Sequence, residues 1–311
     1  MATMHAVRIH EYGGPEVVHY EAVARPAPGP GEVLVRVRAA GVNPVDWKIR
    51  EGWLREMAHH QLPLILGCDV AGEVAELGAG VTKWQRGDAV YAMPGVHGGA
   101  FAEYVALPAS SLARKPRTLD YAQAAAVPVA ALTAWQALFE HGHLQAGQKT
   151  LIHAGAGGVG SFAVQLARWK GAHAWATASE RNASYVRDLG AERVIDYTTQ
   201  RFEDAAHDFD LVVDCAGGET QDRSFAVVKP GGMLVSIVSA PDQDKARARG
   251  VRVAVFMARP DAAHLTEIGN LIDAGHLRVP LSEKLPLAEA RHALNLSATR
   301  HTRGKIVLTV D

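Results

Sequence analysis

The stretch TLIHAGAGGVGSFAVQLARWKG, residues 150–171, holds an apolar strand candidate, a glycine loop and a helical apolar pattern in immediate succession. Gly155, Gly157 and Gly160 have the G-x-G-x-x-G spacing, which is informative here because it follows a strand and opens a helix. We expect the first glycine to permit a tight turn, the second to let the backbone approach a pyrophosphate, and the helix N-terminus to offer free N–H groups. The stretch therefore predicts a dinucleotide site, and the alternative is a glycine turn without a ligand. The contacts would come from Gly155, Gly157, Gly158, Val159 and Gly160.

Short apolar strands and helical stretches alternate after about residue 130, which favours a doubly wound parallel sheet, a Rossmann domain. The six strand candidates are residues 149–154, 172–178, 192–197, 209–217, 231–239 and 251–258. A weakly apolar run, residues 122–139, precedes them and carries Pro128; we expect a buried helix broken at that proline rather than a membrane span.

The first 125 residues have a different texture, with short apolar runs cut by glycine and proline. Residues 33–39, VLVRVRA, alternate with a period of two, which is typical of a strand in a small β-barrel or sandwich. The last strand candidate of the chain is a short apolar run of the same kind. We therefore expect an α/β protein whose barrel domain comprises residues 1–125 and 276–311 and whose Rossmann domain comprises residues 126–275.

The end of the second Rossmann strand decides between NADH and NADPH. An NAD site usually has an acidic residue there, whereas this chain has Ser179, followed by Glu180 and Arg181. Glu180 would favour NADH, but Arg181 can bind a 2′-phosphate through its guanidinium fork, and we favour NADPH. The alternatives are a helix N-cap for Ser179 and a solvated charge for Arg181. Tyr197, after the third strand, is expected on the adenine side or as an ordinary strand-end aromatic.

Composition sets the broad class of the protein. The 311 residues are 48% hydrophobic and 21% charged with a net charge of -1, which allows a core for two domains and gives no indication of nucleic-acid or membrane partners. Two cysteines, and an N-terminal segment without an apolar signal region, predict a reduced, cytoplasmic protein without disulfides.

Several motifs in order along the chain resemble the medium-chain dehydrogenase/reductase superfamily. They are PGPGEVLVRVRAAGVNPVDWKIREG, GCDVAGEV, WQRGDAVYA, GAFAEYV, AALTAWQAL, AGAGGVGSFAVQLA and RGKIVL. The segment NPVDWKIR is similar to the zinc-free branch of NADPH-dependent quinone oxidoreductases, zeta-crystallin and alkenal/enone reductases. The resemblance implies a GroES-like barrel domain, a Rossmann domain, and a homodimer formed through the last Rossmann strands near residues 251–257.

The resemblance also locates the positions that hold a catalytic zinc in other members of the superfamily. They fall on Asn43, on Cys68 and near residues 127–130, where no ligand type is in reach. A catalytic zinc needs three protein ligands, so we expect no metal and interpret Cys68 as a small apolar packing residue. The paired histidines at 59/60 and 141/143 have no third ligand nearby in sequence, and we expect them to be solvated.

Without a metal, the resemblance implies hydride transfer from C4 of NADPH to a quinone or to the β-carbon of an activated alkene. The protein must then stabilise the developing oxyanion, and Asn43 and Lys48 are the expected donors. Asp46 would order the ribose hydroxyls or Lys48; structural ion pairing is the alternative for Asp46 and Lys48. Some zinc-free quinone reductases carry a tyrosine where Lys48 stands.

Further contacts are expected from residues placed by the same resemblance. Thr133 would lie by the nicotinamide, Trp47 and Trp53 would line the acceptor pocket, and Cys215 and Ala216 follow the fourth strand; Lys305 would reach the cofactor. The alternatives are a helix-interior threonine, core aromatics, and a lysine that solvates the start of the last strand. Two other functions stay open: a zinc-type alcohol dehydrogenase of the same fold, and a non-enzymatic NADPH-binding sensor or structural protein.

Overall fold

A computed structural model of the chain describes residues 2–310, and these form two compact units. One unit comprises Met1–Val129, Pro260–Gly275 and Val279–Asp311, and the other comprises Ala130–Arg259 and His276–Arg278. The expected division lay at 125/126 and 275/276, so the segment 260–275 joins the first unit and not the second. The α/β class, with a barrel and a Rossmann sheet, is confirmed.

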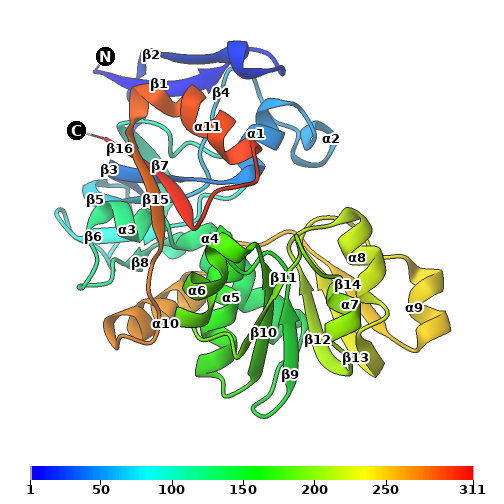
Figure 1. Cartoon of the computed structure of the whole chain (residues 1–311). Coiled ribbons are helices and arrows are strands. Elements are labelled where there is room, and N and C mark those ends of the chain that lie inside the picture. Colours follow the sequence, from blue (N-terminus) through cyan, green and yellow to red (C-terminus); the bar gives the residue numbers. More distant parts are fainter. Residues whose placement is uncertain (1, 311) are drawn as a thin grey trace. The chain divides into compact units, whose positions relative to one another are not determined.

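The first unit is built on β3, the long central strand of a seven-stranded sheet (Figure 1). The strand order is β15–β16–β3–β5–β6–β8, with β7 also paired to β3, and a smaller sheet has the order β2–β1–β4. Val33, Val35 and Val37 are buried in the core of this unit, as the period-two pattern predicts. The last strand, β16, pairs antiparallel with β3.

The bounds in the first unit are β1 Thr3–Ile9, β2 Val18–Ala24, β3 Glu32–Val42, α1 Pro44–Arg50, α2 Arg55–Ala58, β4 Leu64–Ile65, β5 Val70–Leu77, β6 Ala89–Ala92, β7 Tyr104–Pro108, β8 Ala113–Arg114, α3 Tyr121–Ala125, α10 Ala262–Asp273, β15 Leu281–Pro286, α11 Ala290–Ala298 and β16 Lys305–Thr309. Helix α4, Pro128–Trp135, begins at its proline after α3 has ended, which confirms the predicted break.

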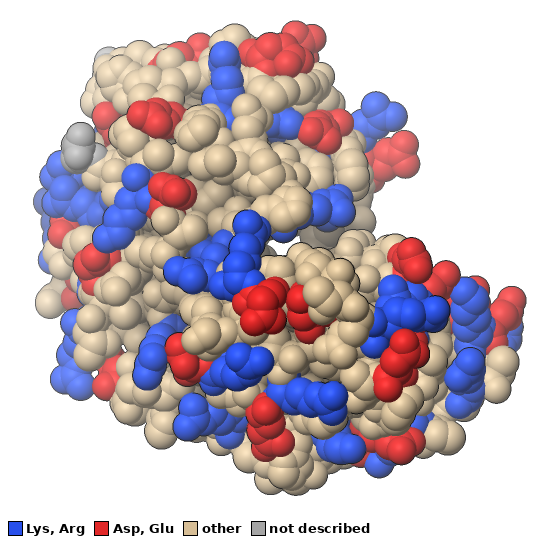
Figure 2. All heavy atoms as spheres, viewed as in Figure 1, with Lys and Arg blue, Asp and Glu red and all other residues tan. Residues whose placement is uncertain are grey.

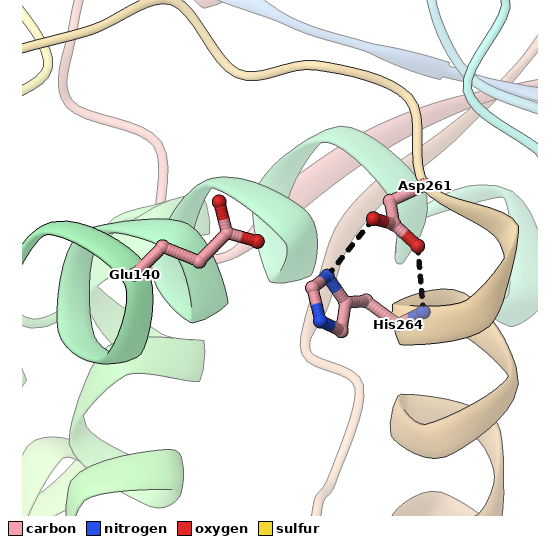
Figure 3. A group of neighbouring side chains, drawn as sticks. All are labelled: Glu140, Asp261 and His264. Carbon is pink, nitrogen blue, oxygen red and sulfur yellow. Dashed lines mark hydrogen bonds and ion pairs between the residues drawn. The ribbon is translucent and has the colours of Figure 1, made fainter. Parts of the chain in front are cut away.

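Helix α10 belongs to the first unit because its contacts are with the barrel. The Tyr91 hydroxyl donates to the Leu265 carbonyl, and the Asp273 carboxylate accepts from the Arg117 and Thr118 backbone N–H groups at 3.1 and 3.0 Å. Its N-terminus is capped by Asp261, which accepts from the His264 backbone N–H at 2.9 Å (Figure 3). An amphipathic pattern predicts this helix but does not say which core it covers.

The second unit is a six-stranded parallel sheet with the order β11–β10–β9–β12–β13–β14. All six predicted strands are present. The bounds are β9 Lys149–Ile152, α5 Gly158–Trp169, β10 His173–Ala178, α6 Glu180–Asp188, β11 Arg193–Asp196, α7 Phe202–Ala205, β12 Phe209–Asp214, α8 Gly218–Ser224, β13 Val228–Ser236, α9 Gln243–Arg249 and β14 Arg252–Val255. The strand order reverses between β9 and β12, which is where doubly wound sheets bind ligands, at the carboxyl ends of the strands.

The surface carries both signs of charge, interspersed over the face shown in Figure 2. This agrees with the net charge of -1. Cys68 and Cys215 are both free thiols. Among residues 2–310, no helix is both long enough and apolar enough to cross a membrane.

Candidate functional site

The residue with a left-handed conformation in the glycine loop of the second unit is Ala154, not Gly155. Ala154 has a φ of +55°, in the left-handed region that disfavours a residue with a Cβ. Gly155 is needed for a close approach instead, since a Cβ there would lie 2.8 Å from the Ala176 Cβ. Gly160 is needed for the same reason, because a Cβ there would lie 2.2 Å from the Ala154 carbonyl oxygen. Gly155 lies within the turn that the Gly157 N–H closes on the Ala154 carbonyl, and the left-handed conformation falls on the residue before it.

Gly157 leaves room for a ligand at the start of α5. A Cβ at this position would meet only the Ala154 carbonyl oxygen, at 3.3 Å, so the space beyond its Cα is open. Gly157 is the N-cap residue, and Gly158 and Val159 begin the twelve-residue helix. The first N–H groups of a helix have no partner within the helix, and they attract anions. The residues present therefore fit a pyrophosphate.

The carboxyl end of β10 has the polar residues expected of a ribose site. Ser179 is the N-cap residue of α6, but its hydroxyl makes no capping hydrogen bond and accepts from the Asn182 side-chain amide at 3.2 Å. Arg181 is exposed in the first turn of α6. At the end of β11, Tyr197 is 56% exposed. The turn after it is held by Asp196, which sequence reasoning did not single out and which accepts from the Thr198 backbone N–H and hydroxyl at 3.0 and 2.7 Å.

The carboxyl end of β12 is organised by Asp214, another residue that the sequence did not point out. Its carboxylate accepts from the Ala216 and Gly217 backbone N–H groups at 2.9 and 2.8 Å and from the Ser236 hydroxyl at 2.8 Å. This network holds the turn that contains Cys215 and Ala216. Burial raises the pKa of the Cys215 thiol, which keeps it protonated.

The first unit contains a buried polar cluster formed by Asn43, Asp46, Asp69 and Lys305. The Lys305 ammonium donates to the Val42 carbonyl at 3.1 Å, to the Asp69 carboxylate at 3.0 Å and to the Asn43 side-chain oxygen. Lys305 is only 4% exposed, so the alternative that it solvates the start of β16 is wrong. The three N–H groups of an ammonium are all used by these three oxygens.

The Asn43 side chain is held at both ends by this cluster. Its amide nitrogen donates to Asp69 at 2.8 Å and to the Gly41 carbonyl at 3.4 Å, while its oxygen accepts from Lys305. The residue is 3% exposed and is the N-cap of α1. In this geometry neither amide hydrogen is left for a substrate oxygen.

Asp46 lies in the same cluster and does not pair with Lys48. Its carboxyl accepts from the Asn43 backbone N–H at 2.7 Å and lies near the Cys68 thiol. Burial raises the pKa of Asp46 to about 7. Its place in the fold is therefore inside the barrel, at the first turn of α1.

Lys48 is the candidate donor that this arrangement leaves available. No carboxylate pairs with it within the described residues, and its ammonium lies 5.8 Å from the Trp47 ring centre and 5.7 Å from that of Trp53. Burial, followed by the nearby Arg300 charge, lowers the pKa of Lys48. Trp47 is part of the barrel core, whereas Trp53 is 61% exposed. In the second unit, Thr133 is buried on α4.

Known proteins share both parts of this architecture. The alcohol dehydrogenase GroES-like domain family matches residues 29–117, and the zinc-binding dehydrogenase family matches residues 189–308. A chloroplast envelope quinone oxidoreductase homolog from Arabidopsis thaliana is 35% identical over 98% of both chains. The chain belongs to the quinone oxidoreductase branch of the medium-chain dehydrogenase/reductase superfamily.

Two further relatives agree with this assignment to the quinone oxidoreductase branch. The structure of the quinone oxidoreductase from Coxiella burnetii superposes with a TM-score of 0.94, at 34% identity and over all of both chains. The NADPH-dependent alkenal/one oxidoreductase, chloroplastic, of Arabidopsis thaliana is 34% identical over 96% of this chain and 77% of its own length.

A catalytic zinc does not fit the donor set of this branch member. At the positions that the superfamily resemblance assigns to zinc ligands, Asn43 is held by Asp69 and Lys305, and Cys68 is buried. Burial, followed by the nearby Asp46 charge, raises the pKa of the Cys68 thiol. The third position lies in the apolar run 127–130, where the Val129 backbone N–H donates to Asp69 at 2.6 Å. A zinc needs three ligands, and this set offers one thiol.

Proposed function

We propose that this chain is an NADPH-dependent reductase that transfers a hydride to quinones or to α,β-unsaturated carbonyl compounds without a metal. The observation that carries the proposal is the engagement of Asn43 by Asp69 and Lys305. A zinc ligand is thereby replaced by an amide with both ends hydrogen-bonded. Quinones and enones are already electrophilic, so hydride addition to them does not require a Lewis acid.

NADPH supplies the hydride from C4 of its nicotinamide, and the chain binds and orients it. Gly158, Val159 and Gly160, in the first turn of α5, present N–H groups to the pyrophosphate, and Gly155 and Gly157 shape the loop before them. Arg181, exposed beside Ser179, supplies a guanidinium for the 2′-phosphate, and this favours NADPH over NADH. Thr133, Tyr197, Cys215 and Ala216 complete the proposed cofactor contacts, whereas the bonds of the buried Lys305 to Val42, Asn43 and Asp69 leave it no N–H for the cofactor.

The developing oxyanion needs a donor, and Lys48 is the group that the fold leaves free for it. Asn43 and Asp46 act indirectly: their hydrogen bonds fix the first turn of α1, the helix that carries Lys48. A partly buried ammonium is stronger as a donor than one in bulk water. Trp53, which is exposed, provides the aromatic contact for a planar acceptor, and the buried Trp47 packs edge to face against it.

We also propose that the protein works in the cytoplasm as a homodimer. Among the described residues, β14 pairs with β13 only and leaves its other edge open. Val255 and Met257, at and just after the end of this strand, are 48% and 42% exposed. An unpaired strand edge with apolar side chains favours pairing with a second copy.

The test is NADPH oxidation, followed by reduced-nicotinamide absorbance in buffer containing EDTA. The acceptors are 1,2-naphthoquinone and a short alkenal, with NADH as the cofactor control and Cys68→Ala as the control variant. Turnover that survives EDTA, prefers NADPH and persists in the variant supports the proposal. Activity lost to EDTA and restored by zinc would overturn it in favour of a zinc-type dehydrogenase. Tight NADPH binding without turnover on either acceptor would favour a non-enzymatic role.

A further inference from the structure

His153 lies at the carboxyl end of β9, directly before the turn at Ala154, and is completely buried. Its Nε2 atom is 2.9 Å from the Ser224 hydroxyl, on α8. Its Nδ1 atom is 3.2 Å from the Thr177 hydroxyl, on β10. The histidine thus connects three elements directly beneath the glycine loop.

The neighbouring bonds determine which way each hydrogen bond runs. The Ser224 hydroxyl donates its one hydrogen to the Thr220 carbonyl at 2.7 Å, so it can only accept from the imidazole. Nε2 of His153 must therefore carry the hydrogen. In a neutral imidazole the other nitrogen is an acceptor, so Nδ1 accepts from the Thr177 hydroxyl. Burial lowers the pKa of His153 to about 4, which keeps the ring neutral.

The hydroxyl oxygen of Thr177 can then accept a hydrogen bond from the glycine loop. It accepts from the Ala154 backbone N–H at 3.2 Å, while the Thr177 carbonyl accepts from the Gly155 N–H at 2.9 Å. Ala154 is the residue in the left-handed conformation, and its carbonyl accepts from the Gly157 N–H at 2.9 Å. A one-way series of hydrogen bonds runs from Ala154 through Thr177 and His153 to α8.

We propose that His153 is a positioning residue for dinucleotide binding, acting as the Nε2–H tautomer. It fixes the Thr177 hydroxyl as an acceptor for the Ala154 N–H and so holds the disfavoured turn that opens the N-terminus of α5. The inference rests on the proposed function, because it assigns the loop to NADPH. The ring itself touches no cofactor atom in this scheme.

The first test needs no substitution. Nitrogen-15 NMR of the wild-type imidazole should show a protonated Nε2 and an unprotonated Nδ1 for His153. A protonated Nδ1 at neutral pH would overturn the proposal, because the Thr177 hydroxyl would then have no acceptor in the ring.

The second test compares Thr177→Val with Thr177→Ser, which removes or keeps the hydroxyl. Thr150→Val is the matched control, since the Thr150 hydroxyl is buried in β9 and has no hydrogen-bond partner among residues 2–310. We expect Thr177→Val to weaken NADPH binding by about tenfold, the effect of one hydrogen bond, and to raise the KM for NADPH with kcat retained. Thr177→Ser and Thr150→Val should stay within about twofold of wild type.

Amide hydrogen exchange in the apo protein separates this proposal from the proposed function. We expect faster exchange at Ala154 and Gly155 in Thr177→Val, and wild-type exchange in Thr150→Val. Equal effects of the two valine variants on binding and exchange would overturn the positioning role. If the wild type binds neither NADPH nor NADH, the proposed function fails, while the tautomer and the exchange rates still decide whether the series of hydrogen bonds holds the turn.

Discussion

Substitution of Asp46 by asparagine should make the stability of the protein respond differently to pH. Burial raises the pKa of this carboxyl from 3.8 to about 7, so the folded protein keeps a proton that the unfolded chain loses. A group with a raised folded pKa contributes stability that is fully present below the unfolded pKa and is lost as pH rises through the folded pKa. This rise of the Asp46 pKa corresponds to about 4 kcal/mol of unfolding free energy between strongly acidic and alkaline solution.

Most of this loss falls between pH 5 and pH 8. Over that window wild type should lose about 2.5 kcal/mol of unfolding free energy at this site, while asparagine cannot ionise. Asparagine keeps an oxygen that accepts from the Asn43 N–H. The unfolding free energy of Asp46→Asn relative to wild type should therefore rise by about 2.5 kcal/mol from pH 5 to pH 8.

Urea unfolding at pH 5, 6, 7 and 8 measures this difference directly. Titratable groups distant from Asp46 are common to both proteins and cancel in the subtraction. Asp120→Asn is the control, because the pKa of this N-cap carboxyl is lowered and its contribution changes only in more acidic solution. A relative stability of Asp46→Asn that does not change with pH would refute the reasoning: Asp46 would then be ionised in the folded protein across the whole window.

Three other predictions follow from the same structure. Lys48→Ala should lower kcat for 1,2-naphthoquinone by about 10- to 100-fold with little change in the KM for NADPH, because it removes one oxyanion donor. Steady-state kinetics at saturating NADPH measure this effect. An unchanged kcat would exclude Lys48 as the oxyanion donor. Arg181→Ala should weaken the binding of NADPH by about tenfold and leave the binding of NADH unchanged, as measured by calorimetric titration. Equal losses of affinity for the two cofactors would refute a contact with the 2′-phosphate. Burial lowers the pKa of folded His153 from 6.5 to about 4. Between these two pH values the unfolded chain protonates this histidine and the folded protein does not. The unfolding free energy should therefore fall by about 3 kcal/mol as pH drops from 6.5 to 4. His153→Gln should lack that slope in urea titrations, and an equal slope would assign the acid sensitivity to another group.

The local sequence pattern was sufficient for the strands of the second unit and insufficient for the conformation of its glycine loop. Six strands and a glycine loop follow from periodicity and spacing, because each βα unit is formed by residues close together in the chain. The left-handed conformation of Ala154 does not, since its N–H donates to the Thr177 hydroxyl on the neighbouring strand, a contact that the local pattern does not show. Gly155 lies in the turn as expected, but the positive φ falls on Ala154.

The difference between a local sequence pattern and a contact between distant residues also explains why Asn43 was expected to be a free donor. The segment NPVDWKIR shows its polar residues but not their partners, and the partner of the Asn43 oxygen is Lys305, 262 residues away. Sequence periodicity carries no information about such a pair. The sign that could have drawn attention to it is a lysine at the start of an otherwise apolar last strand, KIVLT, which is buried and needs acceptors.

The buried cluster of Asn43, Asp46, Asp69 and Lys305 would help to position the oxyanion donor in the proposed metal-free reaction. A buried ammonium is costly unless its hydrogens are all bonded, and Lys305 meets that condition with one carboxylate, one amide oxygen and one backbone carbonyl. Two of these acceptors, Val42 and Asn43, lie at the end of β3 and at the N-cap of α1. Lys305 and Asp69 therefore fix the start of the helix that carries Lys48. In the proposed reaction the Lys305 charge would hold Asn43 at the start of α1, and the oxyanion donor would be Lys48, further along the same helix.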